Sequence, residues 1–345
     1  MQLFSHDLGI DLGTANVLIY VDGKGVVIRE PAVVAVDKNT GNILAVGAAA
    51  RNMLGRTPGN VVAMHPLKDG VISDHEMTVK MLQAFFREAA KSSLFTPKPR
   101  VVICVPSGVT EVEERTVINA AIDAGARRAY LIEEPLAAAL GAGLDIKGPN
   151  GQMIVDIGGG TTDVAVLTLN GVAVSSSIKV AGDAFDEAIG RYVRHQYDMV
   201  IGQVTAEDIK IQIGSVYPRP EVVSMNVKGR DVKTGMPRQI TLLSSEIHKV
   251  LSRPAKQIVD VVLSVLEQTS PELVSDISEN GITLTGGCSQ IWGMDKLLTE
   301  KTGTICTLAD DPDSCVAYGC GKSLAWINHM QEGPINIAKK RLLQG

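Results

Sequence analysis

The sequence is poor in aromatic residues, in histidine and in long apolar runs. Phe, Trp and Tyr make up 4% of the 345 residues, so the core must consist mainly of aliphatic side chains and methionine. The six histidines are scattered with no pair at i, i+4, which argues against a structural zinc site. No stretch approaches the ~20 apolar residues that span a bilayer, and the N-terminus does not resemble a signal peptide. Any membrane contact should therefore be peripheral.

Cysteine and charge exclude further classes of protein. The five cysteines are odd in number and form no Cys-x-x-Cys, which favours a reduced cytoplasmic interior over a disulfide framework. The formal net charge of −5 gives no reason to expect nucleic-acid binding. Hydrophobic residues at 45% and charged residues at 21% are typical of a globular protein, and the length suggests about two domains.

The order of apolar runs and turns predicts an α/β protein. Residues 8–12, 17–21 and 26–28 are predicted strands joined by tight turns, which gives three antiparallel strands at a sheet edge. Strand and helix then alternate, with a strand at 100–105 and a helix that Thr110 and Glu113 open as a capping box. Thr205 is likewise predicted to cap a helix, and 245–267 to form a long one.

An early pattern returns in the middle of the chain. Ile10-Asp11-Leu12-Gly13-Thr14 is similar to Val155-Asp156-Ile157-Gly158-Gly159, and each copy places an Asp at a strand end before a glycine-containing hairpin turn. The repeat suggests an internal duplication, with a cleft between two related halves. Glycine lets backbone N–H groups approach phosphate oxygens, and a carboxylate beside them suits a hydrated Mg²⁺. One such turn is weak support for a nucleotide site, but two make a two-hairpin clamp much more probable.

Two other nucleotide motifs are rejected. Gly321-Lys322-Ser323 resembles the end of a Walker A loop, but Val316 stands where that motif needs its first glycine. The segment also lies in a helical pattern that follows Pro312. No complete G-x-G-x-x-G follows a strand, so a dinucleotide-binding fold is not expected.

The motifs together resemble the actin/Hsp70/sugar-kinase superfamily, and MreB/Mbl-type bacterial actins most of all. The resemblance extends from about residue 7 to about residue 325. The segments that carry it are 10–16, 55–59, 69–72, 105–107, Glu133-Glu134-Pro135, 137–139, 156–163, 205–210, 228–231, 271–273 and Leu284-Thr285-Gly286-Gly287.

The resemblance implies an actin-like ATPase fold. Two duplicated RNase H-like domains, each with a small subdomain, would hold a nucleotide in the central cleft. The expected division is 1–30, 78–148 and 320–345 for subdomain IA, 31–77 for IB, 149–184 and 248–319 for IIA, and 185–247 for IIB.

The resemblance also assigns roles to individual residues, with ATP or ADP and Mg²⁺ as cofactors. Glu134 would position the attacking water with help from Thr161, although a carboxylate at a helix start can also be purely structural. Asp11 and Asp156 would hold Mg²⁺ through water. The nucleotide contacts would be Thr14, Ala15 and Asn16 on the first turn, Gly158, Gly159 and Gly160 on the second, and Glu207, Asp208, Ile209, Lys210, Gly286, Gly287, Cys288 and Ser289 around ribose and base.

One segment departs from the family pattern. After Gly286-Gly287 the family usually has a third glycine and an apolar run, whereas this chain has Cys288-Ser289-Gln290-Ile291-Trp292. The shape of the base pocket is therefore open, although nucleotide binding is still expected.

Membrane contact is predicted for two apolar dipeptides. Leu94-Phe95 lies between Arg87, Lys91, Lys98 and Arg100, an arrangement that suits an anionic membrane surface, and the resemblance indicates an insertion loop at this place. Leu3-Phe4 at the N-terminus would add to it. The alternative is that both dipeptides pack on the protein body.

The resemblance implies a filament that uses ATP as its switch, with paired antiparallel protofilaments at the inner face of the cytoplasmic membrane. Partners would be a second copy of the chain, membrane proteins of the elongation machinery and cell-wall synthesis enzymes, in the service of cell shape. Two alternatives are a sugar-kinase-type phosphotransferase, which needs a substrate pocket and a catalytic Asp, and an Hsp70-like module, which needs a peptide-binding domain.

Overall fold

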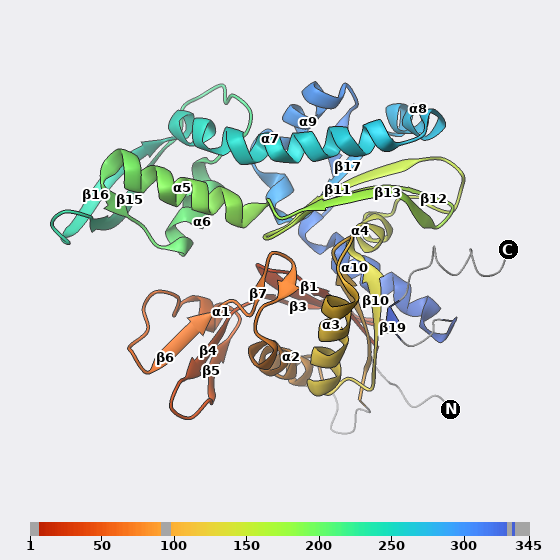
Figure 1. The fold of residues 1–345 in the computed structure, drawn as a ribbon, viewed down its shortest axis with the longest axis horizontal. Coiled ribbons are helices and arrows are strands. Elements are labelled where there is room, and N and C mark those ends of the chain that lie inside the picture. Colours follow the sequence, from red (N-terminus) through yellow and green to blue (C-terminus); the bar gives the residue numbers. More distant parts are fainter. Residues whose placement is uncertain (1–6, 91–97, 330–332, 335–345) are drawn as a thin grey trace.

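Two large sheets lie one above the other, with helices between them and on both outer faces (Figure 1). The computed structural model describes residues 7–90, 98–329 and 333–334. The layers run from outer helices through the first sheet, two central helices and the second sheet to further outer helices. The α/β prediction is confirmed.

The first sheet has the strand order β19-β10-β9-β1-β2-β3. Its strands are β1 (Leu8–Leu12), β2 (Asn16–Val21), β3 (Gly25–Pro31), β9 (Arg100–Val105), β10 (Arg128–Glu133) and β19 (Gly333–Pro334). The first three strands pair antiparallel at one edge, as the sequence predicts, and β1 then pairs parallel with β9. The register sets Asp11 beside Leu18, at the end of β1 where the first turn begins.

The second sheet repeats this plan in the order β13-β12-β11-β17-β18. Its strands are β11 (Gln152–Ile157), β12 (Thr162–Thr168), β13 (Gly171–Ile178), β17 (Ile282–Thr285) and β18 (Cys306–Leu308). An antiparallel meander is again followed by parallel strands, and Asp156 pairs with Asp163 where β11 and β12 end and begin. The matching strand orders confirm the duplication that the repeated motif indicates.

Two glycine-containing helices fill the space between the sheets. These helices, α4 (Glu134–Ala142) and α10 (Cys315–Ser323), pack on one another and bury apolar side chains from both sheets. A Cβ on Gly141 would lie 1.7 Å from the Cys315 carbonyl oxygen, and one on Gly319 would lie 1.7 Å from the Ala137 carbonyl oxygen. Gly321-Lys322-Ser323 ends α10, and a Cβ on Gly321 would lie 2.4 Å from the Tyr20 ring of β2. The segment is therefore part of a packed helix, and the rejection of a Walker A loop is confirmed.

The outer helices cover the far faces of the two sheets. Around the first sheet lie α2 (His75–Ala89) and α3 (Glu111–Asp123), and around the second lie α5 (Gly182–Tyr197), α7 (Ser244–Gln268), α8 (Pro271–Asn280) and α9 (Met294–Thr302). The capping box of α3 is confirmed: Glu113 N–H donates to Thr110 Oγ1 at 3.3 Å, and Thr110 N–H donates to Glu113 Oε2 at 2.7 Å. Three short 3₁₀ turns complete the described helices: η1 (Gly287–Gln290), η2 (Pro312–Ser314) and η3 (Leu324–His329).

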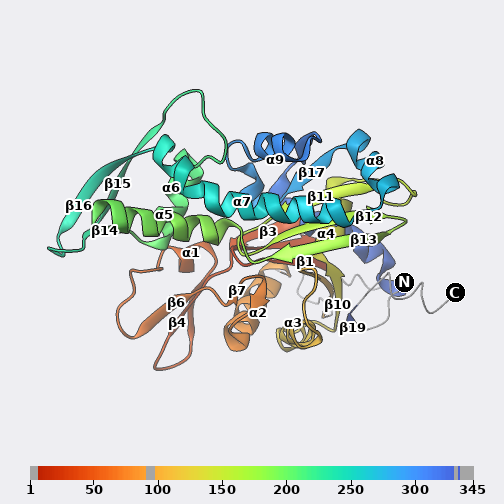
Figure 2. The same ribbon diagram turned by 45° about the horizontal axis from the view of Figure 1, so that its top comes forward.

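Each half also carries a small lobe, and the two lobes lie at the same end of the molecule (Figures 1 and 2). The first lobe contains β4 (Val34–Asp37), β5 (Ile43–Val46), β6 (Val61–Met64) and α1 (Ala48–Arg51), with the short pair β7 (Leu67–Lys68) and β8 (Val71–Ile72) beside it. The second contains β14 (Met199–Val200), β15 (Ser224–Asp231), β16 (Pro237–Leu243) and α6 (Gln203–Ile213).

The start of α6 corrects one prediction. Thr205 does not cap this helix, because Gly202 is the N-cap and Thr205 lies within the first turn. Glycine is acceptable at an N-cap and has no side chain that a sequence pattern would reveal. The helix therefore begins three residues earlier than a cap at Thr205 would place it. Its side faces the first lobe, where the Glu207 carboxylate forms an ion pair with Arg51 of α1.

Candidate functional site

A cavity of about 530 Å³ opens between the two halves. Both hairpin turns, α6, the turn after β17 and the segment before α10 contribute to its walls. Among the residues named from sequence, those that line it are Asp11, Thr14, Ala15, Asn16, Glu134, Asp156, Gly158, Gly159, Gly160, Thr161, Glu207, Lys210, Gly286, Gly287 and Cys288. Residues more than a hundred positions apart in the chain thus meet in one site.

The two glycine turns touch each other at the cavity. A Cβ on Gly159 would lie 2.6 Å from the Ala15 Cβ, and one on Gly160 would lie 2.5 Å from the Thr14 Oγ1. The Thr14 hydroxyl is held in place because it accepts a hydrogen bond from the Gly70 N–H at 2.9 Å. A side chain at Gly159 or Gly160 would push the turns apart, so glycine at these two positions keeps the backbone amides of both turns within reach of one small anion.

Asp11 and Asp156 lie beside these turns with their carboxylates largely removed from water. Burial raises the pKa of Asp11 to about 7, although a hydrogen bond from Cys104 and the charge of Asp313 act on it as well. Burial also raises the pKa of Asp156 well above its usual value, and the nearby charges of Asp11 and Asp163 raise it further. Neither buried oxygen of Asp156 has a hydrogen-bond partner among the described residues.

These two carboxylates fit a hydrated divalent cation. Carboxylate oxygens are hard ligands, and Mg²⁺ usually keeps several waters while it binds one or two carboxylates and phosphate oxygens. A cation between them would offset the repulsion of two buried negative charges and satisfy the open oxygens of Asp156. Within the described residues no group of three or more His, Cys, Asp or Glu is arranged to hold a metal ion.

Glu134 begins α4 and faces the same cavity. If its carboxylate served mainly to complement the helix dipole, the pKa of that carboxylate should be lowered. Instead, burial raises the pKa of Glu134 well above its usual value, and the charges of Asp163 and Asp156 raise it further. Burial and the neighbouring carboxylates thus favour the protonated form of Glu134 when no cation is bound, and its ionised form is a stronger base than an exposed carboxylate. The buried Thr161 lines the cavity with it.

The wall formed by α6 presents only part of the segment named from sequence. Glu207 and Lys210 line the cavity. The Lys210 ammonium donates to Asp186 Oδ2 at 3.0 Å and to the Gly182 carbonyl at 3.2 Å, which fixes its position. Asp208 and Ile209 do not line the cavity, and Ile209 is fully buried in the core of the second half.

The turn after β17 closes the opposite wall. Gly286 has a positive φ of 82°, and a Cβ there would lie 2.3 Å from Asp156 Oδ1 and 2.4 Å from the Ile157 carbonyl oxygen. Gly287 and Cys288 line the cavity. Cys288, which stands where the family usually has a third glycine, is therefore part of the cavity wall. Ser289 does not line the cavity. Its side chain is buried, and its hydroxyl donates to the Gly286 carbonyl at 2.6 Å.

Several residues that line the cavity are not predicted as site residues from the sequence. Arg29, Arg219 and Asp313 line the same walls, as do Gln290 and Trp292 from the departing segment. Arg219 and Lys296 place their cationic groups 5.1 and 4.7 Å from the Trp292 ring centroid. The unusual Trp292 is a signal in the sequence, but the positions of Arg29 and Arg219 depend on contacts that no local pattern shows.

The residues named for membrane contact, Leu3, Phe4, Leu94 and Phe95, lie outside the described residues. In the portion that is described, no helix is long and apolar enough to cross a membrane. Of the basic residues around the loop, Arg100 donates to the Asp7 carboxylate, so part of its charge is already matched within the protein.

Two duplicated halves with a small lobe each, and a cavity between facing glycine turns, define an actin-like protein. The family model described as MreB/Mbl protein matches residues 5–332. The chain belongs to the MreB/Mbl family, as its motifs predict.

The chain is similar to known proteins along nearly its whole length. The cell shape-determining protein MreB of Escherichia coli strain K12 is 52% identical over 330 residues, which is 94% of this chain and 95% of the relative. The crystal structure of MreB5 of Spiroplasma citri bound to AMPPNP has a TM-score of 0.87 at 40% identity and covers 94% of this chain and 97% of that one. The structure of the same protein bound to ADP also has a TM-score of 0.87, at 39% identity and 99% coverage of both chains. The prediction of an actin-like fold is confirmed.

Proposed function

We propose that this chain binds ATP and ADP with Mg²⁺ in the central cavity and hydrolyses ATP. The observation that carries the proposal is the contact between the two glycine turns, Gly159 against Ala15 and Gly160 against Thr14, directly beside Asp11 and Asp156. This arrangement offers backbone donors from both halves and a place for a cation. A similar MreB5 has been solved with AMPPNP and with ADP, which supports the same class of ligand here.

Each part of the site has a task in this proposal. Asp11 and Asp156 would hold Mg²⁺ through water, and the bound ion would neutralise charge on the phosphate oxygens. The turns at 14–16 and 158–160 hold the phosphates with backbone N–H groups. Glu134 orients the attacking water, with Thr161 beside it, since both residues line the cavity that the glycine turns enclose. Glu207 and Lys210 contact ribose and base, with Gly286 and Gly287 opposite.

We further propose that nucleotide state controls a filament that serves cell shape. The E. coli relative is a cell shape-determining protein. Head-to-tail contacts between identical copies would generate the filament, with protofilaments paired antiparallel. It would lie in the cytoplasm at the inner face of the cell membrane, held there by Leu3, Phe4, Leu94 and Phe95. Elongation-machinery membrane proteins and cell-wall synthesis enzymes would be its partners. The division into subdomains IA, IB, IIA and IIB at the boundaries given above belongs to this proposal.

Calorimetry and sedimentation test these proposals separately. Folded protein with Mg²⁺ should bind ADP and AMPPNP at one site per chain, and ATP should yield free phosphate. Pelleting with Mg-ATP at micromolar protein, followed by electron microscopy on lipid, should reveal filaments. No heat of binding with either nucleotide would overturn the site, whereas binding and hydrolysis without any pelleting would leave the site and refute the filament.

A further inference from the structure

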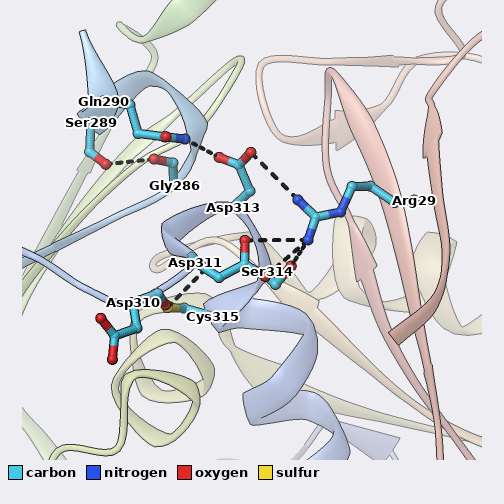
Figure 3. A network of polar contacts seen from close by, with 9 residues as sticks. All are labelled: Arg29, Gly286, Ser289, Gln290, Asp310, Asp311, Asp313, Ser314 and Cys315. Carbon is cyan, nitrogen blue, oxygen red and sulfur yellow. Dashed lines mark hydrogen bonds and ion pairs between the residues drawn. The ribbon is translucent and has the colours of Figure 1, made fainter. Parts of the chain in front are cut away.

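One end of the cavity carries a chain of polar side chains that joins the turn after β17 to β3 and to the segment before α10 (Figure 3). Gln290, Asp313 and Arg29 all line the cavity. The Gln290 Nε2 donates to Asp313 Oδ1 at 2.7 Å, and the other Asp313 oxygen lies 3.6 Å from Arg29 Nη1. Figure 3 shows these three side chains in a row, with the Asp313 carboxylate between the amide and the guanidinium.

The guanidinium of Arg29 is itself fixed from the other side. Its Nη2 donates to both Asp311 oxygens, at 3.0 and 3.3 Å, and also to the Ser314 hydroxyl. Arg29 comes from β3 of the first half, whereas Asp311 and Ser314 lie at and beside η2, just before α10. The Asp313 carboxylate therefore meets a cation whose position two other residues determine.

This arrangement fixes which way the Gln290 amide points. An ionised carboxylate can only accept hydrogen bonds, so the amide must turn its NH₂ group toward Asp313. The carbonyl oxygen Oε1 then remains as an acceptor, and it has no hydrogen-bond partner within the described part of the chain. An amide that could rotate freely would offer a donor or an acceptor equally well. The neighbouring ion pair removes that choice.

The place of this acceptor is the purine end of the proposed nucleotide site. Gln290 ends η1, which starts at Gly287, and a Cβ on Gly287 would lie 3.1 Å from Asp313 Oδ1. The Gly286-Gly287 pair is the wall assigned to the base, so the amide and the carboxylate belong to the same wall. A purine there meets an oxygen acceptor at Gln290 and a negative charge behind it.

We propose that Gln290, oriented by Asp313 and Arg29, selects purine nucleotides that carry an amino group at position 6 over those that carry an oxygen there. An amino group donates to the Gln290 carbonyl. A 6-oxo group would instead place two acceptors against each other, with no donor between them. The inference rests on the proposed nucleotide function and adds the residue that sets base preference.

Calorimetry with ADP and IDP in the presence of Mg²⁺ tests this inference, because the two ligands share ribose and phosphates. The wild-type protein should bind ADP about tenfold more tightly than IDP, the size expected for one hydrogen bond gained and one repulsion avoided. Gln290→Leu removes the amide at similar size and should bring the two affinities within about twofold. Asp313→Asn should also reduce the preference, since a neutral amide no longer dictates the direction of Gln290.

Asp310→Asn is the matched control, because Asp310 is exposed, points away from the network in Figure 3 and does not line the cavity. This variant loses the same charge near the same turn and should keep the wild-type ratio. Equal wild-type affinities for ADP and IDP, or an unchanged ratio in Gln290→Leu, would overturn the inference while the nucleotide site stands. Binding of neither ligand by folded wild-type protein would instead refute the proposed function.

Discussion

The methyl group of Ala15 packs directly against Gly159, so the first turn of one half and the second turn of the other meet without space for another carbon atom. A Cβ built on Gly159 would lie 2.6 Å from the Ala15 Cβ, well inside van der Waals contact. The closeness of the two halves at this point sets the width of the cavity where we propose that the phosphates bind. Nucleotide affinity should therefore respond to a single added methyl group.

Gly159→Ala is expected to weaken the binding of Mg-ADP by at least about tenfold, because the added methyl group forces the turns apart and moves backbone donors away from the phosphates. Gly190→Ala is the control, since nothing lies within 4 Å of a Cβ there and the residue is inside α5. Helix propensity predicts that Gly190→Ala binds normally and gains up to about 1 kcal/mol of stability. Calorimetry and thermal unfolding measure both effects, and normal ADP affinity in Gly159→Ala would show that the contact is not important.

Glu134→Gln should separate hydrolysis from binding. The amide keeps the size of the side chain but orients water less well, so the rate of phosphate release should fall by about 100-fold or more. The affinity for AMPPNP should change by less than about threefold. Glu133→Gln, one residue earlier and absent from the cavity wall, should hydrolyse ATP at close to the wild-type rate. Equal rates for Glu134→Gln and the wild type would remove Glu134 from the reaction.

The sequence identifies features that contiguous residues determine. The capping box of α3 depends on Thr110 and Glu113 alone, and the glycine turns are visible as repeated motifs, so these predictions hold in the structure. The run 207–210 shows a limit of such motifs. Successive residues of a helix point about 100° apart. Glu207 and Lys210, three positions apart, therefore share the cavity face of α6, and Ile209 points into the core.

Other site features depend on contacts between distant segments. Arg29 meets Asp311, Asp313 and Ser314 across more than 280 positions of sequence, and no local pattern marks the arginine as a cavity residue. The unusual Cys288–Trp292 segment indicates only that the base pocket differs from the family pattern. What replaces the pattern, an amide fixed by an ion pair, appears only once the two halves are placed together.

Stability without metal or nucleotide should decrease as pH rises from 5.5 to 8.0. Burial raises the pKa of Asp11 and of Asp186 to about 7 and that of Asp163 to about 6. The folded state therefore binds more protons than the unfolded state in this window, and the free energy of unfolding falls as the pH rises through these folded pKa values. Carboxylates with lowered pKa, such as Glu113 and Glu246, change stability only below their usual range and do not interfere.

Thermal unfolding in EDTA should accordingly show a midpoint that drops by several degrees between pH 5.5 and 8.0. Saturating Mg-ADP should flatten or reverse the trend, because the cation favours the ionised carboxylates that protons otherwise neutralise. A midpoint in EDTA that rises over the same range would contradict the raised pKa values.

Membrane binding should depend on the apolar pair Leu94-Phe95. Leu94→Ser combined with Phe95→Ser removes the side chains that would enter the lipid interface, so the fraction that pellets with anionic vesicles should fall by at least half. Ile305→Ser is the control, since Ile305 is an apolar residue elsewhere on the surface with 69% of its area exposed. Because Arg100 is paired with Asp7, the four basic residues near the loop should together attract anionic lipid less than their number suggests. Pelleting should therefore weaken only moderately as the salt concentration rises. Full pelleting of the double serine variant, with ADP binding intact, would show that another surface contacts the membrane.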